Sequence, residues 1–319
     1  MIDLKKLISG DRRTLAKAIT LVESHHELHK AEAAKLIDQA LPHSGKSLRL
    51  GISGSPGVGK STFIEAFGNY LVDQGRKLAV VAVDPSSPIT GGSILGDKTR
   101  MESLSRREEV FIRPSPSLGF LGGVAQSTRE AIILCEAAGF DTILVETVGV
   151  GQSEITAASM VDFFIVLILP NSGDELQGIK KGIIEMASAI IINKADGDSK
   201  TAAELTKGQY EGALELLPDS SKNTQAVLLC SAKEKTGLDE IWKTIQKQYN
   251  DSLQSGAFSQ KRRQQLETWF YDQFKDSLIK TVLDDSKYQK DIKKELKLVL
   301  DHKSGVSSSV HRILDLILK

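Results

Sequence analysis

The spacing of apolar residues changes twice along the chain, and the three regions that result predict different structures. In the first region, apolar side chains recur every three or four residues, which puts them on one face of a helix. Ser9 or Asp11 is suited to cap the start of such a helix. We therefore expect residues 1–46 to form an N-terminal helical extension, whose apolar face consists of Leu4, Leu7, Ile8, Leu15, Ile19 and Val22.

Short apolar runs alternate with helix-length segments between residues 47 and 250. These runs are LRLGIS, LAVVAVD, VFIR, TILVET, FFIVLILP, AIIINK and AVLLCSA. Runs that are apolar at every position, rather than at every second one, indicate strands that are covered on both faces. The pattern predicts an α/β domain in which helices cover both faces of a mostly parallel sheet, giving three layers.

The strand-like runs stop at residue 251, where a helical pattern returns. Residues 251–319 are predicted to form a C-terminal helical arm, with a Lys-rich amphipathic stretch near its end. Two interpretations of its apolar stripe stay open, because the stripe fits either packing onto the sheet domain or a contact between subunits. The stripe consists of Leu266, Trp269, Phe270, Phe274, Leu278 and Val282.

Charge and composition narrow the class of protein. The chain carries 41 basic and 41 acidic side chains, so no net charge favours a nucleic acid or a membrane surface as partner. Cys135 and Cys230 lack the spacing of a zinc site or a disulfide framework, which fits a reducing compartment. Adjacent His25, His26 and His29 lie among polar residues, as is typical of a solvated helix face. The start of the chain lacks the apolar core of a signal peptide, and no apolar run reaches the roughly 18 residues of a membrane span. We therefore expect a cytoplasmic protein.

A glycine-rich stretch directly follows the first strand-like run. It reads GSPGVGKS and fits the pattern GxxxxGK[ST] of a phosphate-binding loop, or P-loop, between a strand and a helix. Glycines let the backbone N–H groups turn inward around a phosphate, and the helix N-terminus adds a favourable field. Lys60 would bridge phosphate oxygens, and Ser61 would ligate Mg²⁺. The predicted nucleotide contacts are Ser55, Pro56, Gly57, Val58, Gly59, Lys60, Ser61 and Thr62.

A second motif predicts which base is bound. The residues after the run AIII read NKAD and fit the pattern NKxD. A carboxylate at the fourth position accepts both N–H donors of guanine, whereas adenine lacks one of them, and a site built for donors rejects such an analogue strongly. A Ser-Ala-Lys loop, which commonly backs the guanine, follows the run AVLLC. We therefore expect GTP or GDP as ligand, contacted by Asn193, Lys194, Asp196, Ser231, Ala232 and Lys233.

Three carboxylates are predicted around a magnesium ion. Asp84 and Glu146 each end a strand-like run, and ligands of parallel sheets bind beyond the carboxyl ends of the strands. Asp97 lies in a loop, where it would either join the metal site or cap a helix. Glu146 stands where many GTPases have Asp, and its longer side chain favours a contact through water to Mg²⁺. Gly149 would bring its backbone N–H to the γ-phosphate.

Four longer stretches together resemble the MeaB/ArgK/MMAA family of P-loop GTPases. They read AVDPSSP at 82–88, IRPSPSLGFLGG at 112–123, ETVGVGQSE at 146–154 and NSGDELQGIKKGI at 171–183. The resemblance extends over almost the whole chain. It implies a chaperone of an adenosylcobalamin-dependent mutase of the methylmalonyl-CoA type, which hydrolyses GTP slowly, gates cofactor loading and protects the mutase.

The resemblance also implies roles for individual residues. Lys60, Ser61 and Thr62 resemble the residues for phosphate and Mg²⁺, and the three carboxylates resemble the family's acidic cluster. The loop 171–180 is similar to a switch that responds to the nucleotide and to the mutase, with Gln177 and Lys180 as candidates for partner-dependent activation. The C-terminal helices are similar to a homodimerisation arm. The chain departs from the family pattern at 120–121 and 126–127.

Two other functions stay open. One is a metallochaperone GTPase, which would need a Cys or His cluster near the nucleotide. The other is an ArgK-like ATP-dependent kinase linked to lysine, arginine and ornithine transport, which the NKAD motif disfavours. Apart from Gln152 and Gln177, the switch motifs hold no obvious arginine finger or glutamine. We therefore expect slow intrinsic hydrolysis that a partner stimulates.

Overall fold

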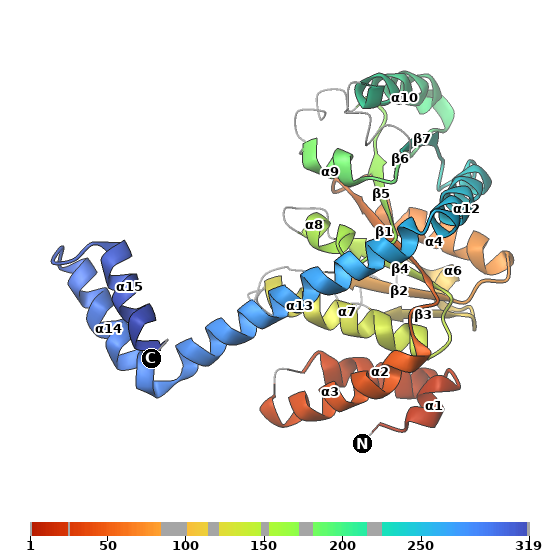
Figure 1. Cartoon of the computed structure of the whole chain (residues 1–319). Coiled ribbons are helices and arrows are strands. Elements are labelled where there is room, and N and C mark those ends of the chain that lie inside the picture. Colours follow the sequence, from red (N-terminus) through yellow and green to blue (C-terminus); the bar gives the residue numbers. More distant parts are fainter. Residues whose placement is uncertain are drawn as a thin grey trace. The chain divides into compact units, whose positions relative to one another are not determined.

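The chain divides by its internal contacts into two compact units, Met1–Arg262 and Arg263–Lys319. The computed structural model (Figure 1) describes residues 2–24, 26–83, 101–113, 121–147, 153–171, 181–215 and 225–317. The division into residues 1–46, 47–250 and 251–319 stays a prediction. Among the described residues, no helix is both long and apolar enough to cross a membrane.

A seven-stranded sheet forms the centre of the first unit. Its strands are β1 (Leu48–Gly54), β2 (Leu78–Val83), β3 (Val110–Arg113), β4 (Thr142–Thr147), β5 (Phe163–Ile168), β6 (Ala189–Ile192) and β7 (Ala226–Leu229). Each lies in one of the seven apolar runs, apart from Gly54 at the end of β1, and the seven strands pair in parallel, so the predicted α/β fold is confirmed. The continuous apolar runs are explained by burial of both strand faces, as in FFIVLI of β5.

The strand order positions the candidate site. The order is β3-β2-β4-β1-β5-β6-β7, so that β1 lies between β4 and β5. The connection from β1 to β2 crosses β4 in one direction, and the connection from β4 to β5 crosses β1 in the other. Ligands of such sheets bind at this switch point, beyond the carboxyl ends of the strands. Ile52 of β1 is level with Glu146 of β4. The end of β4 therefore lies beside the start of the P-loop.

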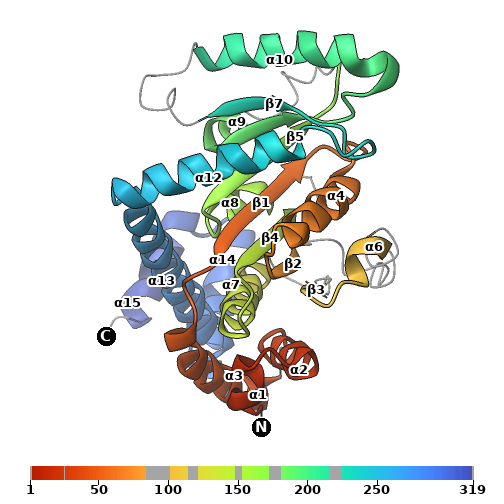
Figure 2. The same ribbon diagram turned by 90° about the vertical axis from the view of Figure 1, so that its right-hand side faces the viewer.

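Helices cover both faces of the sheet (Figures 1 and 2). On one face, α4 (Lys60–Asp73), α6 (Glu102–Ser105) and α12 (Leu238–Gln254) share one apolar cluster with the strands. Other contacts with the strands come from α7 (Leu121–Ala137), α8 (Ser153–Ala158), α9 (Lys181–Met186) and α10 (Lys200–Glu215). Two short 3-10 helices, η1 (Leu41–His43) and η3 (Gly197–Ser199), also belong to this unit.

Three N-terminal helices, α1 (Leu4–Ile8), α2 (Arg12–Val22) and α3 (Glu27–Ala40), pack against α7, as both Figure 1 and Figure 2 show. Of the two predicted caps, Asp11 is the one used: its Oδ1 accepts the Thr14 N–H at 2.8 Å, whereas Ser9 follows the end of α1. The Arg113 guanidinium at the end of β3 pairs with Glu23, which anchors α2 to the sheet.

A buried ionic network joins the amino ends of β1 and β5 to α7 and to the first turns of α13 (Ala257–Asp284). Arg262 donates to the two Asp162 carboxylate oxygens at 2.8 and 2.7 Å, and Asp162 also accepts the Arg49 N–H at 2.8 Å. The Arg49 guanidinium donates to Glu136 at 2.8 and 2.9 Å. The network lies at the edge of the sheet opposite to the P-loop.

The second unit consists of the rest of α13 with α14 (Ser286–Leu300) and α15 (Val306–Ile317). The last two helices contact one another, and Arg312 pairs with Glu295 across them at 2.7 Å. Many of the unit's large apolar side chains are exposed. These are Leu266, Phe270, Tyr271, Phe274, Leu278, Ile279, Leu283, Leu296, Leu300, Val306, Val310, Leu314 and Leu316.

Candidate nucleotide site

The P-loop joins β1 to α4 and adopts a backbone that only glycine tolerates easily. Gly54, Gly57 and Gly59 have φ values of +151°, +81° and +93°. A Cβ atom on Gly54 would lie 2.5 Å from the Leu167 carbonyl oxygen of β5, so this glycine also permits close packing on the neighbouring strand. A Cβ atom on Gly57 would meet no atom within 4 Å. The loop therefore leaves open space beside Gly57.

Lys60 is the first residue of α4, and its ammonium is folded back over the P-loop. Its Nζ donates to the carbonyls of Gly54 at 2.7 Å and Ser55 at 3.2 Å. Burial lowers the pKa of Lys60, and the charges of Glu146 and Glu154 partly offset that shift. The first N–H groups of a helix have no partner inside it, so those at the start of α4 suit an anion.

Ser61 and Glu146 come together as expected for a shared metal site. The Ser61 Oγ lies 3.3 Å from Glu146 Oε1, because Ser61 lies in the first turn of α4 and Glu146 lies near the end of β4 beside it. A hydroxyl and a carboxylate are oxygen donors of the kind that Mg²⁺ prefers, so the two residues fit that ion. Within the described ranges, no group of three or more His, Cys, Asp or Glu side chains is arranged to hold a metal.

The NKAD segment is bonded directly to the P-loop. Asn193 follows β6, and its Nδ2 donates to the Val58 carbonyl at 2.9 Å, while its Oδ1 accepts the Ala232 N–H at 3.2 Å. The Lys194 Nζ donates to the Gly57 carbonyl at 2.9 Å. Asn193 is fully buried between these partners. One asparagine thus connects the phosphate loop, the NKAD segment and the Ser-Ala-Lys loop.

The Ser-Ala-Lys loop orients the carboxylate that we expect to read the base. Ser231 donates its hydroxyl to Asp196 Oδ2, and the same hydroxyl accepts the Glu234 N–H at 3.0 Å. The Ala195 N–H donates to the Cys230 carbonyl at 3.0 Å, so the backbones of the two segments are joined as well. Asp196 is thereby held with one oxygen occupied by Ser231. Lys233 of the same loop is exposed.

Some of the predicted residues lie outside the described ranges. These are Asp84, Asp97, Gly149, Gln152, Gln177 and Lys180. Of the predicted metal set, the structure therefore describes Ser61 and Glu146, and of the predicted catalytic set, Lys60 and Glu146.

One buried carboxylate near the site was not singled out by the sequence. Glu154 lies in the first turn of α8 and is 5% exposed, and its charge acts on Lys60. Its only signal in the sequence is its position at the end of the stretch ETVGVGQSE.

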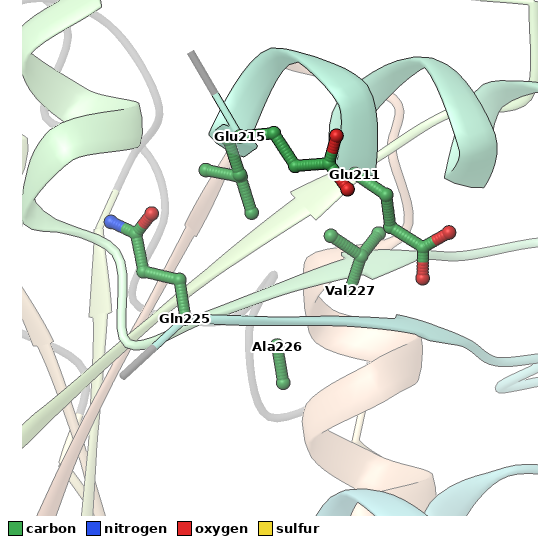
Figure 3. A pocket seen from close by; sticks show the side chains of 6 residues that line it. Glu211, Glu215, Gln225, Ala226 and Val227 are labelled. Carbon is green, nitrogen blue, oxygen red and sulfur yellow. The ribbon is translucent and has the colours of Figure 1, made fainter. Parts of the chain in front are cut away.

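A hollow between α10 and β7 is separate from this site (Figure 3). The Glu211 and Glu215 carboxylates of α10 line it together with Gln225, which precedes β7. This is the amino end of the strand, whereas the P-loop and the NKAD segment follow the carboxyl ends of β1 and β6. The hollow therefore lies away from the residues that we expect to bind the nucleotide.

Comparison with known proteins decides the family. Residues 15–287 match the sequence family described as methylmalonyl Co-A mutase-associated GTPase MeaB. The chain belongs to the MeaB family. It is accordingly a P-loop GTPase, and the resemblance found in its motifs is confirmed.

Named MeaB relatives are similar over most of their length. The GTPase ArgK of Escherichia coli (strain K12) is 52% identical over 277 residues, which are 86% of this chain and 84% of the relative. The mitochondrial methylmalonic aciduria type A homolog of Mus musculus is 46% identical over 325 residues, 98% of this chain and 77% of the relative. A crystal structure described as LAO/AO transport system kinase is 39% identical, with a TM-score of 0.78 over 99% of this chain and 96% of its own.

Proposed function

We propose that this MeaB family member is a slow, partner-stimulated GTPase that serves as a chaperone of an adenosylcobalamin-dependent acyl-CoA mutase. One observation carries the nucleotide part of the proposal: the hydrogen bonds from Asn193 and Lys194 to the P-loop carbonyls. They join the segment that we expect to read guanine to the loop that we expect to hold the phosphates. The mutase part is supported by the family's description and by the naming of the mouse relative.

Selectivity for guanine follows from the chemistry of Asp196. The Asp196 carboxylate has two oxygens, and Oδ2 accepts the hydrogen bond from Ser231. The two oxygens together are suited to accept the two N–H donors of guanine. The Lys194 stem would cover the base, because its Nζ is anchored on Gly57. Ser231, Ala232 and Lys233 would complete the base pocket. Adenine would leave Asp196 without one donor, and such unpaired polar groups weaken binding strongly.

The phosphate end would act by holding charge in place. Ser55, Pro56, Gly57, Val58 and Gly59 would present backbone N–H groups to the phosphates, and Thr62 would contact them from α4. Lys60 would move its donors from the loop carbonyls to phosphate oxygens, and Glu146 would orient the attacking water. A bound Mg²⁺, held by Ser61 and by Asp84, Asp97 and Glu146 directly or through water, would offset phosphate charge.

Slow turnover and stimulation by a partner belong to the same proposal. Phosphoryl transfer depends on positioning and on charge stabilisation, and a supplied catalytic group is worth about 10³ to 10⁵ in rate. Gln177 and Lys180 in the loop 171–180 are our candidates for groups that become active when the mutase binds. Gly149 would contact the γ-phosphate through its backbone N–H. Loss of the γ-phosphate on hydrolysis would then release the loop around Gly149 and the loop from Asp84 to Asp97.

The second unit is proposed to associate with a second copy of the chain. Contiguous exposed apolar surface is rare on monomers and marks interaction sites. In this unit, Phe270 and Phe274 are 66% and 57% exposed and stack on each other with ring centroids 6.4 Å apart. Their spacing along α13 puts them on one helix face. Sedimentation equilibrium should give the mass of a dimer, and of a monomer for the double variant Phe270→Glu/Phe274→Glu.

Two alternatives are tested by binding. The name of the similar transport kinase would fit ATP as ligand. The hydrogen bond from Ser231 to Asp196 of the NKAD segment instead supports GTP as ligand. A metallochaperone would need reactive thiols or histidines, but burial raises the pKa of the Cys230 thiol to about 12 and also raises the pKa of Cys135. Equal affinity for ATP and GTP would contradict the base pocket, and specific binding of Ni²⁺ or Zn²⁺ would favour the metallochaperone.

Hydrolysis and the client are tested separately. Glu146→Ala should lower the GTPase rate well below wild type while guanine nucleotide still binds, and unchanged turnover would remove Glu146 from the mechanism. The client is tested by a pull-down from the same cell. The protein should capture an adenosylcobalamin-dependent mutase, and the amount captured should differ between the GTP-bound and GDP-bound protein. Equal capture in both states, or none, would contradict the chaperone role.

A further inference from the structure

Two buried hydroxyl groups are bonded to each other at the point where β1 and β4 separate. The backbone register of these strands ends at Ile52 and Glu146. At the next position, Thr147 donates its hydroxyl to Ser53 Oγ at 2.9 Å, and a longer contact of 3.4 Å joins it to the Ile52 carbonyl. Beyond this pair, β1 leads into the P-loop, and Thr147 is the last residue of β4.

Stability alone does not explain this pair of hydroxyls. Thr147 and Ser53 are 0% and 1% exposed, so their hydrogen bond lies in the interior. A buried hydroxyl costs free energy unless it is hydrogen-bonded, and replacing both partners by apolar groups of the same shape can be nearly neutral. What two apolar side chains would not supply is a directed bond, which fixes one arrangement of the two strand ends.

The bond lies on the face of the sheet opposite to the Glu146 side chain. Side chains alternate along a strand, so Glu146 and Thr147 point to opposite faces. On the face of Glu146, Leu144 belongs to the apolar cluster that includes residues of α4. The Glu146 carboxylate there lies 3.3 Å from the Ser61 hydroxyl of that helix. Thr147 therefore fixes the β4 backbone directly after the carboxylate, without occupying the space around it.

The spacing between β1 and β4 affects the distance between Ser61 and Glu146. Ser61 follows β1 by way of the P-loop, whereas Glu146 belongs to β4. On the side of β2, the backbone register holds β4 as far as Thr147. On the side of β1, the Thr147 hydroxyl supplies the link at the position after the register ends.

We propose that Thr147 is a positioning residue for the metal site: its hydrogen bond to Ser53 holds the end of β4 against β1 and thereby keeps Glu146 within reach of Ser61. The inference rests on the proposed function, in which these two residues help to hold Mg²⁺. Groups that orient metal ligands typically contribute a factor of about 10 to 100 to metal affinity. Thr147 acts through the backbone rather than through a direct bond to Glu146, so the lower end of this range is expected.

Removal of either partner tests the bond. Thr147→Val removes the hydroxyl and keeps the branched shape of the side chain. In complex with a non-hydrolysable GTP analogue, the full-length variant should bind Mg²⁺ about tenfold more weakly than wild type in a Mg²⁺ titration. Its affinity for the analogue in EDTA should stay within a few-fold of wild type. Ser53→Ala should show the same loss of Mg²⁺ affinity, and it decides the question if Thr147→Val does not fold.

Two control variants separate positioning from a loss of stability. Thr147→Ser retains the hydroxyl and should bind Mg²⁺ within a few-fold of wild type. Thr142→Val removes another buried hydroxyl of β4 at the opposite end of the strand, where it bonds Arg76 at 2.9 Å and Asp141 at 2.8 Å. This variant should be less stable than wild type in urea, as Thr147→Val should be, and should retain wild-type Mg²⁺ affinity.

The double variant Thr147→Val/Ser53→Ala sharpens the separation. It leaves neither hydroxyl in the interior, so it should be more stable in urea than Thr147→Val, in which Ser53 stays buried without this partner. Its Mg²⁺ affinity should remain about tenfold below wild type, because the bond between the strands is still missing. Recovery of Mg²⁺ affinity together with stability would overturn the inference, since the bond would then only support the fold.

Other results would also overturn the inference. Wild-type Mg²⁺ affinity in Ser53→Ala, or in a folded Thr147→Val, would do so, as would an equal loss of Mg²⁺ affinity in Thr142→Val or Thr147→Ser. A wild-type complex with the analogue that binds no Mg²⁺ would instead contradict the proposed metal site. A wild-type protein that binds no guanine nucleotide would contradict the proposed function as a whole.

Discussion

The side-chain amide of Asn193 donates a hydrogen bond of 2.9 Å to the backbone carbonyl of Val58, although the two residues are 135 positions apart. The bond is buried, and it lies where the P-loop meets the segment that follows β6. Because the same side chain also accepts the Ala232 N–H, its removal leaves groups of two different loops without a partner. Asn193 therefore connects the P-loop to the Ser-Ala-Lys loop through its own side chain.

Replacing Asn193 should lower stability and nucleotide affinity together. We expect Asn193→Ala to reduce the free energy of unfolding by about 1 to 3 kcal/mol, because buried polar groups lose their hydrogen bonds. Urea unfolding without nucleotide measures the first effect, and GDP titration measures the second. An unfolding free energy within about 0.5 kcal/mol of wild type, the range of ordinary surface changes, would contradict the role of the bond.

Two P-loop glycines should respond differently to the same substitution. Both have positive φ, but a Cβ atom on Gly59 would lie 3.0 Å from Asn193 Nδ2, whereas one on Gly57 would meet no atom within 4 Å. Gly57→Ala should therefore cost only the backbone strain, about 1 to 2 kcal/mol. Gly59→Ala should cost more, because it also displaces Asn193. Equal unfolding free energies for the two variants, without nucleotide, would contradict this difference.

The Glu136 carboxylate should stabilise the fold in a pH-dependent way. Burial alone would raise its pKa, but the hydrogen bonds and charge of Arg49, with Ser47 and the Gly45 N–H, outweigh burial and hold the pKa below its ordinary value. Its contribution is therefore complete above pH 4.5, the ordinary value, and is lost as the pH falls through the lowered value. The stability difference between wild type and Glu136→Gln should shrink on acidification.

Glu130 on the same helix provides a control of opposite sign. Burial raises its pKa, and the hydrogen bond from Gln126 offsets only part of the shift. A carboxyl whose pKa is raised on folding destabilises the folded state once it ionises. Glu130→Gln should therefore be as stable as wild type or more stable at pH 7, where Glu136→Gln is less stable. Urea unfolding at pH 7 and at pH 4 distinguishes the two, and equal behaviour would contradict both assignments.

The pair of Arg262 and Asp162 should be strongly coupled. Asp162 is 4% exposed, and both of its oxygens accept from Arg262, whose guanidinium also donates to the Gly45 and Ser47 carbonyls. Removing one partner of a buried pair leaves the other uncompensated, which costs about 3 to 5 kcal/mol. Arg262→Ala should show a loss of this size, and the double variant Arg262→Ala/Asp162→Ala should lose less than the sum. Additive losses would contradict the coupling.

Local spacing was sufficient to predict much of the fold. The seven runs are strands because apolar residues at every position can be buried only on both faces of a parallel sheet. Asp11 caps α2 because a short acidic side chain at that offset satisfies an N–H in the next turn, a contact within a few residues of the chain. The P-loop could be recognised for the same reason, since glycine spacing and the adjoining strand and helix are local features.

The sequence by itself determined which residues form the strands and many of the helices, and where the P-loop lies, because these features depend on neighbours a few positions away. Only the tertiary structure decided which segments meet, as in the bonds from Asn193 to Val58 and from Arg262 to Asp162, and that Glu154 is buried. These relationships depend on the order of the strands in the sheet. The spacing along a single chain does not contain that order, since any two parallel strands can pair equally well by pattern alone.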